Sequence, residues 1–322
     1  SADSSAPFAV LAAWALSLGV RMPGEQGGYF GAGFLIALAY LARADGLLLI
    51  VAIPLAWWLL PSPHRLPIEL PDNPAARFVW DHWPREVGSE QDAQRVLGPR
   101  LVNVLDLGVP LLIVIAPWLE RNDLAFGTPF PGSVLSQAWL TDYIDTFNYW
   151  LQPTWQTWLA QSWQTLLSQR LQALAHNGQV FLLATFPWGL LALPGLWLLR
   201  REWRTFPAIV YGILLFFGVA FVFPVSSMSG TFYHSIGALI PFLALATMYG
   251  IYRATEPSGR RWRLSRPLRV TVLVGVLVLA GFQVVQSLPT VTDRHQAEKE
   301  QFEAIAAWLS QNAAPDDVIM TT

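Results

Sequence analysis

The chain has 322 residues, of which 53% are hydrophobic and only 13% are charged, and its formal net charge at pH 7 is −2. The apolar residues come in long blocks, which argues against a water-soluble domain and predicts membrane-spanning helices. Because cysteine is absent, disulfides, a thiolate nucleophile and a cysteine-bound metal are excluded. The small net charge gives no reason to expect nucleic acid as a partner. We therefore expect an all-α, polytopic transmembrane helical bundle in an integral membrane protein.

Apolar blocks close to about 20 residues, the length that crosses a bilayer, mark the predicted spans. A short block covers residues 7–20, and longer ones cover residues 101–119, 180–199, 206–225, 236–252 and 270–288. The block over 28–60 is too long for one span and is interrupted at its centre, so it predicts a hairpin of two short helices. Together these segments make about eight spans, accompanied by interfacial amphipathic helices.

The interruption of the hairpin consists of Arg43 and Asp45, the only charged residues between positions 28 and 60. An ionisable pair near membrane depth is costly unless it faces protein, water or a charged ligand, so it is a candidate functional site. Two interpretations stay open. Arg43 extends to the lipid headgroups and pairs with Asp45, or it binds a phosphate group.

Arginine is concentrated in alternate connections, which indicates the orientation because cytoplasmic loops of membrane proteins collect Lys and Arg. The connections near 200–204 and 253–269 are rich in arginine, whereas the connection 226–235 between them carries no Lys, Arg, Asp or Glu. The alternation places the loop 61–100 in the cytoplasm. It places on the outer side the tip of the hairpin and residues 120–179, 226–235 and 289–322.

The outer segment 120–179 is rich in tryptophan. Glycine and proline over 126–132 predict a rigid, non-helical turn. Farther on, apolar residues recur at helical spacing over 155–171 with glutamines on the other face, which predicts a helix in the membrane interface. Its tryptophans form an aromatic belt at headgroup level or platforms that stack on sugars. Trp139 and Trp150, outside that stretch, are stronger candidates for stacking on a ligand.

The uncharged connection on the outer side contains Tyr233 and His234, on the same side as Arg43 and Asp45. His234 titrates near neutral pH or holds an anion, or it is a histidine satisfied by interfacial hydrogen bonds. The sequence has 5 histidines, scattered without ligand spacing, so no metal site is expected. No glycine-rich phosphate loop or other cofactor motif occurs, which argues against a soluble nucleotide-sugar donor.

Residues 289–322 predict the start of an outer soluble α/β domain that follows a membrane domain over 1–288. An apolar face over 302–309 predicts a helix, and residues 316–320 predict the strand after it. An amphipathic surface helix followed by disorder is the alternative. Because the sequence opens on Ser1 rather than Met and stops at the entry to a strand, we expect further sequence at both ends.

Motifs on the outer side follow one another in a fixed order. They are Gly31-x-Gly33 leading to Ala42-Arg43-x-Asp45-Gly46, then Arg121-Asn122 before Phe126-Gly127-Thr128-Pro129-Phe130-Pro131, then Phe232-Tyr233-His234 before Pro241. In order, spacing and sidedness they resemble the membrane part of GT-C glycosyltransferases. The chain is most similar to the bacterial branch related to protein O-mannosyltransferases and to the lipid A aminoarabinose transferase. The resemblance covers nearly the whole chain.

The resemblance implies transfer of a sugar from a polyprenyl-phosphate donor to a lipid, glycan or protein acceptor, at the outer face of a bacterial-type plasma membrane. It also implies the residues that bind the donor phosphate and sugar, namely Arg43 at the phosphate with Asp45, Arg121, Asn122, Tyr233 and His234 around the pocket. The general base of such enzymes lies in a first outer loop upstream of this sequence, and Asp3 lies near the place of another outer acidic residue. We therefore expect this chain alone to bind donor without turnover.

A transporter or flippase for a lipid-linked or anionic substrate is the alternative, with Arg43 and Asp45 as a gate or an ion-coupled relay. Transporters commonly have two halves with corresponding broken helices, and only the first half of this chain has a charged interruption of this kind. A membrane scaffold without a ligand is a further alternative, but it would leave the charged pair as an unexplained energetic cost.

Overall fold

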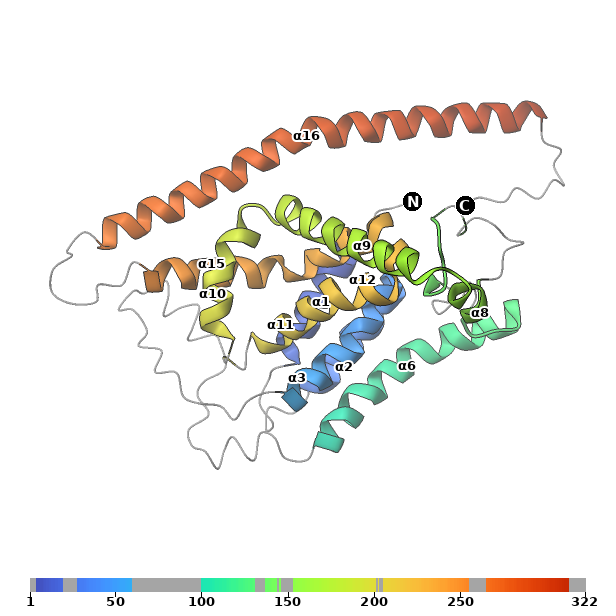
Figure 1. Ribbon diagram of the computed structural model, residues 1–322, viewed down its shortest axis with the longest axis horizontal. Coiled ribbons are helices and arrows are strands. Elements are labelled where there is room, and N and C mark those ends of the chain that lie inside the picture. The colour runs from blue at the N-terminus through green and yellow to red at the C-terminus, as the bar shows by residue number, and fades with distance from the viewer. Residues whose placement is uncertain are drawn as a thin grey trace. The chain divides into compact units, whose positions relative to one another are not determined.

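The computed structural model describes residues 4–19, 28–59, 100–130, 137–143, 145, 153–200, 202, 205–254 and 265–312. Throughout these ranges the regular structure is helical and contains no strand (Figure 1). The all-α class is therefore confirmed for this part of the chain. The chain divides into two compact units, Ser1–Ala254 and Thr255–Thr322. Predictions for Asp3, for most of the loop 61–100, for Trp150 and for the strand over 316–320 fall outside the described residues.

The predicted hairpin is present in the first unit. Helix α1 (Ser5–Leu18) precedes it, and the hairpin itself comprises α2 (Gly28–Ala42), the short 3-10 turn η1 (Ala44–Gly46) and α3 (Leu47–Leu59). At its open end the rings of Tyr29 and Trp57 meet edge to face with centroids 4.8 Å apart. The Trp57 Nε1 donates to the carbonyl oxygen of Gly19 at 2.8 Å, which attaches the end of α1.

The closed end of the hairpin depends on Gly46. A Cβ atom at this position would lie 2.4 Å from the backbone nitrogen of Tyr40 and 2.6 Å from its Cα. These distances are shorter than any van der Waals contact allows, so only glycine permits the chain to fold back on the last turn of α2. The charged interruption read from the sequence is therefore also the point where the chain reverses.

Helix α6 (Arg100–Phe126) packs along α2 and contains the span predicted over 101–119. The two helix backbones approach closely at Gly33, where a Cβ atom would lie 2.1 Å from the carbonyl oxygen of Leu107. Small residues allow such approach between apolar helices. The buried core of the unit is formed mainly by α1, the hairpin, α6 and the later helices α11 and α15.

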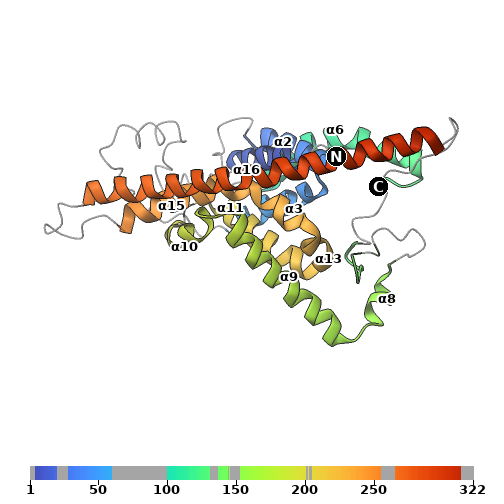
Figure 2. The same cartoon turned by 90° about the horizontal axis from the view of Figure 1, so that it is seen from above.

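The segment predicted as one span over 180–199 is instead broken. Helix α9 (Trp163–Ala184) and helix α10 (Trp188–Leu199) meet at an angle of 101° (Figure 2). Pro187 explains the break, because proline has no backbone N–H and disfavours helical geometry in the preceding residue. The hydroxyl of Thr185 also donates to the carbonyl oxygen of Phe181, one turn earlier.

The amphipathic helix predicted over 155–171 is also divided, into α8 (Trp155–Leu159) and the start of α9. Ser162 begins the second helix, because its hydroxyl accepts a hydrogen bond from the backbone N–H of Thr165 at 3.2 Å. This is an N-cap, the contact with which serine and threonine start helices. The predicted helical periodicity is therefore confirmed, but the axis is interrupted.

The region 205–254 is helical almost throughout. Its elements are α11 (Phe206–Ile213), the π-helical segment η3 (Leu214–Gly218), α12 (Val219–Val222), α13 (Pro224–Ser226), the π-helical segment η4 (Ser227–Thr231), α14 (Phe232–Ser235), η5 (Ile236–Leu239) and α15 (Ile240–Ala254). The connection 226–235, expected as a loop, is thus helical, with a kink at Gly230, whose φ is 116°. A positive φ of this size favours glycine, which explains how the helix changes direction there without ending.

One helix among the described residues, Pro224–Arg253, is long and apolar enough by itself to cross a membrane, and the bent pair of α9 and α10 passes the same test together. The apolar helices Ser5–Leu18, Tyr29–Ala42, Ala44–Leu59 and Phe206–Val222 are shorter. A bundle of about eight spans therefore stays a prediction.

The second unit contains α16 (Ser265–Asn312), a continuous helix of 48 residues. It includes the span predicted over 270–288 and the helix predicted over 302–309, and it passes without a break through the expected domain boundary at 288–289. At 1.5 Å per residue, such a helix is about 72 Å long. Its exposed Lys299 and Glu303 lie one turn apart with 3.8 Å between Nζ and Oε1.

Candidate functional site

The candidate site is centred on Arg43, in the break between α2 and η1. The backbone of Arg43 is extended, with φ −155° and ψ 138°. Its N–H still donates to the carbonyl oxygen of Ala39 at 2.8 Å, and its carbonyl oxygen accepts from the N–H of Gly46 at 3.0 Å. The arginine is therefore held by hydrogen bonds on both sides of the turn.

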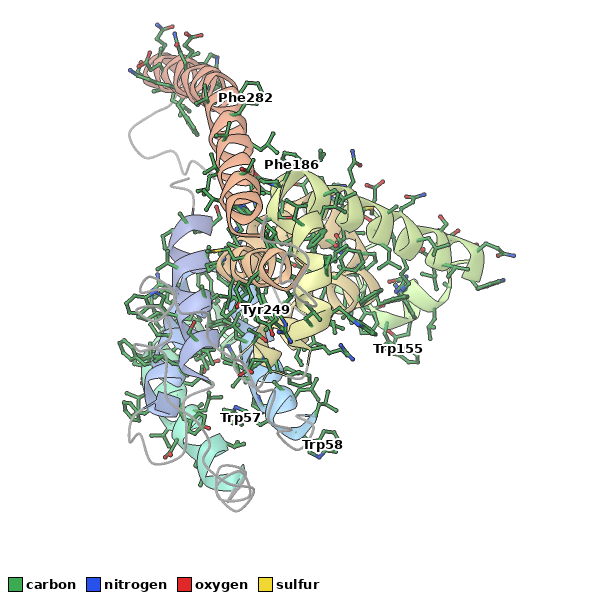
Figure 3. All side chains as sticks on the ribbon, turned by 90° about the vertical axis from the view of Figure 1, so that its left-hand side faces the viewer. Trp57, Trp58, Trp155, Phe186, Tyr249 and Phe282 are labelled. Atoms are coloured by element: carbon green, nitrogen blue, oxygen red, sulfur yellow. The ribbon has the colours of Figure 1, made fainter. Side chains whose placement is uncertain are left out.

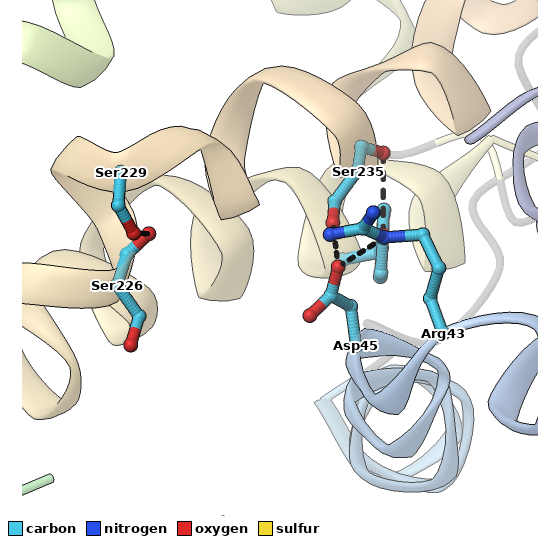
Figure 4. Close-up of polar contacts among 6 residues, drawn as sticks. Arg43, Asp45, Ser226, Ser229 and Ser235 are labelled. Atoms are coloured by element: carbon cyan, nitrogen blue, oxygen red, sulfur yellow. Dashed lines mark hydrogen bonds and ion pairs between the residues drawn. The ribbon is translucent and has the colours of Figure 1, made fainter. Parts of the chain in front are cut away.

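The side chain of Arg43 belongs to a compact polar cluster (Figure 4). Its Nε donates to Oδ2 of Asp45 at 2.9 Å. The hydroxyl of Ser235 donates to the same carboxylate oxygen at 2.7 Å. The side chains of Arg43 and Asp45 retain 20% and 15% of their accessible surface, whereas Ser235 is fully buried. Asp45 is thus oriented by one donor from the same turn, Arg43, and by a second from a distant part of the sequence, Ser235.

A third element supports this cluster from α11. The hydroxyl of the fully buried Tyr211 donates to the carbonyl oxygen of Ser235 at 3.4 Å. The backbone beyond Ser235 packs against α1, where a Cβ atom at Gly237 would lie 3.1 Å from the Cβ of Ala9. The hairpin tip, the segment α14–η5 and α11 therefore meet at the polar cluster.

The guanidinium of Arg43 has unused hydrogen-bonding capacity. A guanidinium carries five N–H donors, and a carboxylate or phosphate engages two of them best in a parallel, bidentate arrangement. Asp45 engages only Nε, and within the described part of the chain neither Nη group donates a hydrogen bond. The amino end of the guanidinium can therefore receive a second anion.

Tyr233 and His234 lie on the short helix α14 with Ser235 and directly precede it in the sequence. Their rings lie edge to face with centroids 5.3 Å apart. Tyr233 is exposed and His234 is half-buried. The kink at Gly230 lies under the imidazole, since a Cβ atom there would be 3.6 Å from Cδ2 and Nε2 of His234.

Arg121 and Asn122 occupy a different position, at the end of α6. Asn122 is buried, and its amide donates to the carbonyl oxygen of Pro129 at 3.4 Å. Arg121 donates to the amide oxygen of Asn122 at 3.4 Å and lies over the ring of Trp118 at 5.1 Å. No hydrogen bond or ion pair among the residues described joins them to the cluster around Arg43. Their contacts attach the turn after Gly127, whose φ is 69°, to α6.

Sequence reasoning missed Ser235 and Tyr211, which complete the cluster. A hydroxyl group inside an apolar segment was the available signal. The same signal applies to a second buried network, in which the amide of Asn177 donates to the carbonyl oxygen of Phe216 at 2.9 Å and Ser227 donates to Asn177 Oδ1 at 2.7 Å. Phe216 lies in the π-helical segment η3, where the shifted hydrogen-bond pattern allows a side chain to reach the carbonyl.

Among the residues that the structure describes, no group of three or more His, Asp or Glu side chains is arranged to hold a metal ion. Comparison with protein-family models, with curated proteins and with solved structures gives no match.

Proposed function

We propose that this chain is the membrane part of a GT-C-type glycosyltransferase, which transfers a sugar from a polyprenyl-phosphate donor to a lipid, glycan or protein acceptor at the outer face of the plasma membrane. The observation that carries the proposal is the half-buried guanidinium of Arg43, fixed by Asp45 through Nε with both Nη groups unbonded among the described residues. Such a group is oriented before a phosphate arrives.

The energetics of this arrangement favour a phosphate ligand. A charge-assisted hydrogen bond strengthens as the local dielectric falls, and Arg43 lies among apolar helices rather than in open water. Asp45 offsets part of the charge of Arg43, so the pair is tolerated in the absence of ligand. During sugar transfer the leaving phosphate gains negative charge, and a fixed cation that stabilises this charge lowers the barrier.

A lipid-linked donor also fits the surface of the first unit. Several of its helices carry large apolar side chains that are exposed in the protein alone, among them Trp58 and Trp155, and Phe186 is exposed in the turn between α9 and α10 (Figure 3). On α6, Leu112 and Ile113 expose 61% and 63% of their surface, and on α10 Trp197 exposes 67%. Apolar surface of this extent is characteristic of contact with lipid or with a partner. It supports an integral membrane location.

Asp45 is the residue that holds the guanidinium of Arg43. Its Oδ2 accepts from both Arg43 and Ser235. The proposal therefore keeps Asp45 as the residue that positions Arg43. The general base is assigned to the upstream outer loop that the resemblance implies.

A lipid-linked substrate transporter or flippase is the second candidate. The observation that favours it is the number of interrupted helices, namely the 101° bend between α9 and α10 and the kink at Gly230. Discontinuous helices of this kind often form substrate sites in transporters. Such a protein would move fluorescent polyprenyl phosphate across proteoliposomes, whereas a transferase would bind it without accelerating its flipping.

Native mass spectrometry of the protein in nanodiscs with added polyprenyl phosphate tests the proposal. We expect Arg43→Ala to weaken binding at least about tenfold, because a charge-assisted contact is lost. Arg43→Lys keeps the charge and loses the fork, so it should retain part of the affinity. Arg200→Ala is the matched control, since Arg200 is exposed and stacks on Trp197 of its own helix. Equal binding by the wild type and Arg43→Ala would refute the phosphate role.

A further inference from the structure

A second buried polar network lies away from Arg43 and has Asn177 of α9 at its centre. The side-chain amide of Asn177 donates to the carbonyl oxygen of Phe216 in η3 at 2.9 Å. Its amide oxygen accepts from the hydroxyl of Ser227 in η4 at 2.7 Å. Asn177 and Ser227 are both fully buried. One side chain therefore joins α9 to two π-helical segments. Asn177, Phe216 and Ser227 are called the Asn177 network below.

The two segments that Asn177 joins also lead to the residues that support Asp45. Tyr211 precedes η3 in the helical stretch Phe206–Val222, and Ser235 follows η4 in the helical stretch Pro224–Arg253. The hydroxyl of Tyr211 donates to the carbonyl oxygen of Ser235 at 3.4 Å. The hydroxyl of Ser235 donates to Oδ2 of Asp45 at 2.7 Å. The two stretches that meet at the Asn177 network therefore meet again at the polar cluster.

An aromatic contact joins the two stretches between these points. The rings of Phe216 and Phe232 lie edge to face with centroids 5.7 Å apart, and Phe232 is almost fully buried. Phe216 and Tyr211 are five positions apart, which in a regular α-helix corresponds to about 140° around the axis. The i→i+5 hydrogen bonds of η3 add a residue to the turn, so both side chains can contact α14. The packing on α14 thus depends on the π-helical segment that Asn177 holds.

The kink at Gly230 makes these side-chain contacts important for the direction of α14. In a straight α-helix the backbone hydrogen bonds fix the relative positions of residues such as Ser227 and Ser235. Gly230 lies between them with a φ of 116°, and glycine can adopt a wide range of backbone angles. The contacts of Ser227 on one side of the kink and of Ser235 on the other therefore determine how the segment is directed.

We propose that Asn177 is a positioning residue for the Arg43 site and acts through the helical segment 227–235. Buried polar networks in which every member is hydrogen-bonded favour one packing arrangement, because a shift leaves a buried donor or acceptor unsatisfied. The Asn177 network holds η4 against α9 and η3, so the helix that continues from η4 brings Ser235 to Asp45. Asp45 in turn holds the guanidinium of Arg43 through Nε. The inference rests on the proposed function, because the site that Asn177 supports is the phosphate site at Arg43.

Polyprenyl-phosphate affinity in nanodiscs, measured by native mass spectrometry beside thermal unfolding, tests the inference. Asn177→Leu replaces the amide by an apolar side chain with the same number of heavy atoms, and Ser227→Ala removes the donor to that amide. Each variant should weaken binding about fivefold, as the loss of one hydrogen bond does. No hydrogen bond among the described residues joins Asn177 or Ser227 to Arg43, so the effect would be indirect.

Thr247→Val is the matched control. Thr247 is also fully buried, and its hydroxyl donates to the carbonyl oxygen of Trp188 at 3.2 Å, which joins α15 to α10 rather than to η3 or α9. The variant removes a buried hydrogen bond between helices and keeps the size of the side chain. It should lower the unfolding temperature and leave polyprenyl-phosphate affinity unchanged.

A double variant separates positioning from a general loss of packing. Ser235→Ala alone should weaken binding about fivefold, since one hydrogen bond to Asp45 is lost. If Asn177 acts through Ser235, adding Asn177→Leu to Ser235→Ala should weaken binding by less than about a further twofold. Independent effects would instead multiply to about 25-fold. If Asn177→Leu does not fold, Ser227→Ala takes its place in the same comparison.

The failure of this inference is distinguishable from the failure of the proposed function. Weaker binding in Arg43→Ala together with wild-type binding in Asn177→Leu and Ser227→Ala would overturn the inference alone. Effects of Asn177→Leu and Ser235→Ala that multiply would also overturn it, as would a loss of affinity in Thr247→Val as large as in Asn177→Leu. Wild-type binding in Arg43→Ala would overturn the proposed function and this inference with it.

Discussion

The guanidinium groups of Arg43 and Arg170 are both partly buried, and different contacts stabilise them. Arg43 lies beside a carboxylate that is itself held by a serine from a distant segment, and it keeps its amino groups unbonded within the described residues. Arg170 lies over an indole ring and donates to a carbonyl oxygen of its own helix. The first arrangement orients positive charge towards a ligand, whereas the second uses the charge to support an aromatic surface. The guanidinium of Arg43 is therefore more available to a ligand than that of Arg170.

The largest expected effect comes from removing the carboxylate of the first site. Asp45→Ala leaves Arg43 partly buried without its counter-ion, so the free energy of unfolding should fall by about 3 kcal/mol. Reversible unfolding in mixed detergent micelles measures this value. Asp123→Ala is the control, because Asp123 is exposed at the end of α6, and it should change stability by less than about 0.5 kcal/mol. Equal losses of unfolding free energy in Asp45→Ala and Asp123→Ala would show that the Arg43–Asp45 ion pair does not stabilise the protein more than an exposed carboxylate does.

The next largest loss of stability is expected from a change in the turn that positions Arg43. Gly46→Ala introduces a Cβ atom against the backbone of Tyr40, so the turn has to open and stability should fall by about 2 kcal/mol. Polyprenyl-phosphate binding should weaken with it, because the turn positions Arg43. Gly178→Ala, where a Cβ atom meets nothing within 4 Å, should be neutral or slightly stabilising. Unchanged stability and unchanged polyprenyl-phosphate binding in Gly46→Ala would contradict the role given to this turn.

A smaller effect is expected at Ser235. Ser235→Ala removes the hydrogen bond to Asp45 in a buried position, which should cost about 1 kcal/mol of unfolding free energy. Ser229→Ala is a close control on the same segment, because its exposed hydroxyl donates only to the carbonyl oxygen of Ser226 at 3.0 Å (Figure 4). Thermal unfolding of both variants measures the difference. A loss in Ser229→Ala as large as in Ser235→Ala would contradict the role given to Ser235.

The smallest effect on stability is expected at Arg170. Arg170→Gln removes the cation from the face of Trp158, and the unfolding free energy should fall by about 0.5–1 kcal/mol. Polyprenyl-phosphate affinity, measured in nanodiscs, should not change. A fall in phosphate affinity in Arg170→Gln, with none in Arg43→Ala, would mean that Arg170 rather than Arg43 holds the phosphate.

The hairpin was predictable because its evidence is local. An apolar block too long for one span, with Arg43 and Asp45 at its centre, indicates both the turn and its charged tip. The break at Pro187 was also visible in the sequence, but hydropathy measures the length of an apolar block and not its direction. The segment 226–235 was expected as a loop because it is polar, although its serines and glycine are accommodated within a kinked helix.

The composition of the site was only partly predictable. The contact between Ser235 and Asp45 joins residues 190 positions apart, and no local pattern marks which of several serines makes it. The prediction that Arg121 and Asn122 belong to the donor pocket stays a prediction, because no hydrogen bond or ion pair among the described residues joins them to Arg43 or Asp45. Their contacts are with Trp118 and Pro129, which are close in sequence and fix the end of a helix. The charge of the loops predicts which residues lie on the same side of the membrane. It does not predict which of their side chains are in contact.

The most direct test of the central claim is a phosphorus–nitrogen dipolar measurement by solid-state NMR, on protein with nitrogen-labelled arginine in lipid bilayers containing polyprenyl phosphate. We expect dephasing of the Nη resonances of Arg43 by the phosphorus of polyprenyl phosphate, and weaker dephasing of its Nε, which remains bound to Asp45. Arg43→Lys assigns the resonance by removing it. Absence of dephasing at Arg43, or dephasing at Arg121 or Arg170 instead, would contradict the claim that Arg43 is the phosphate-binding residue.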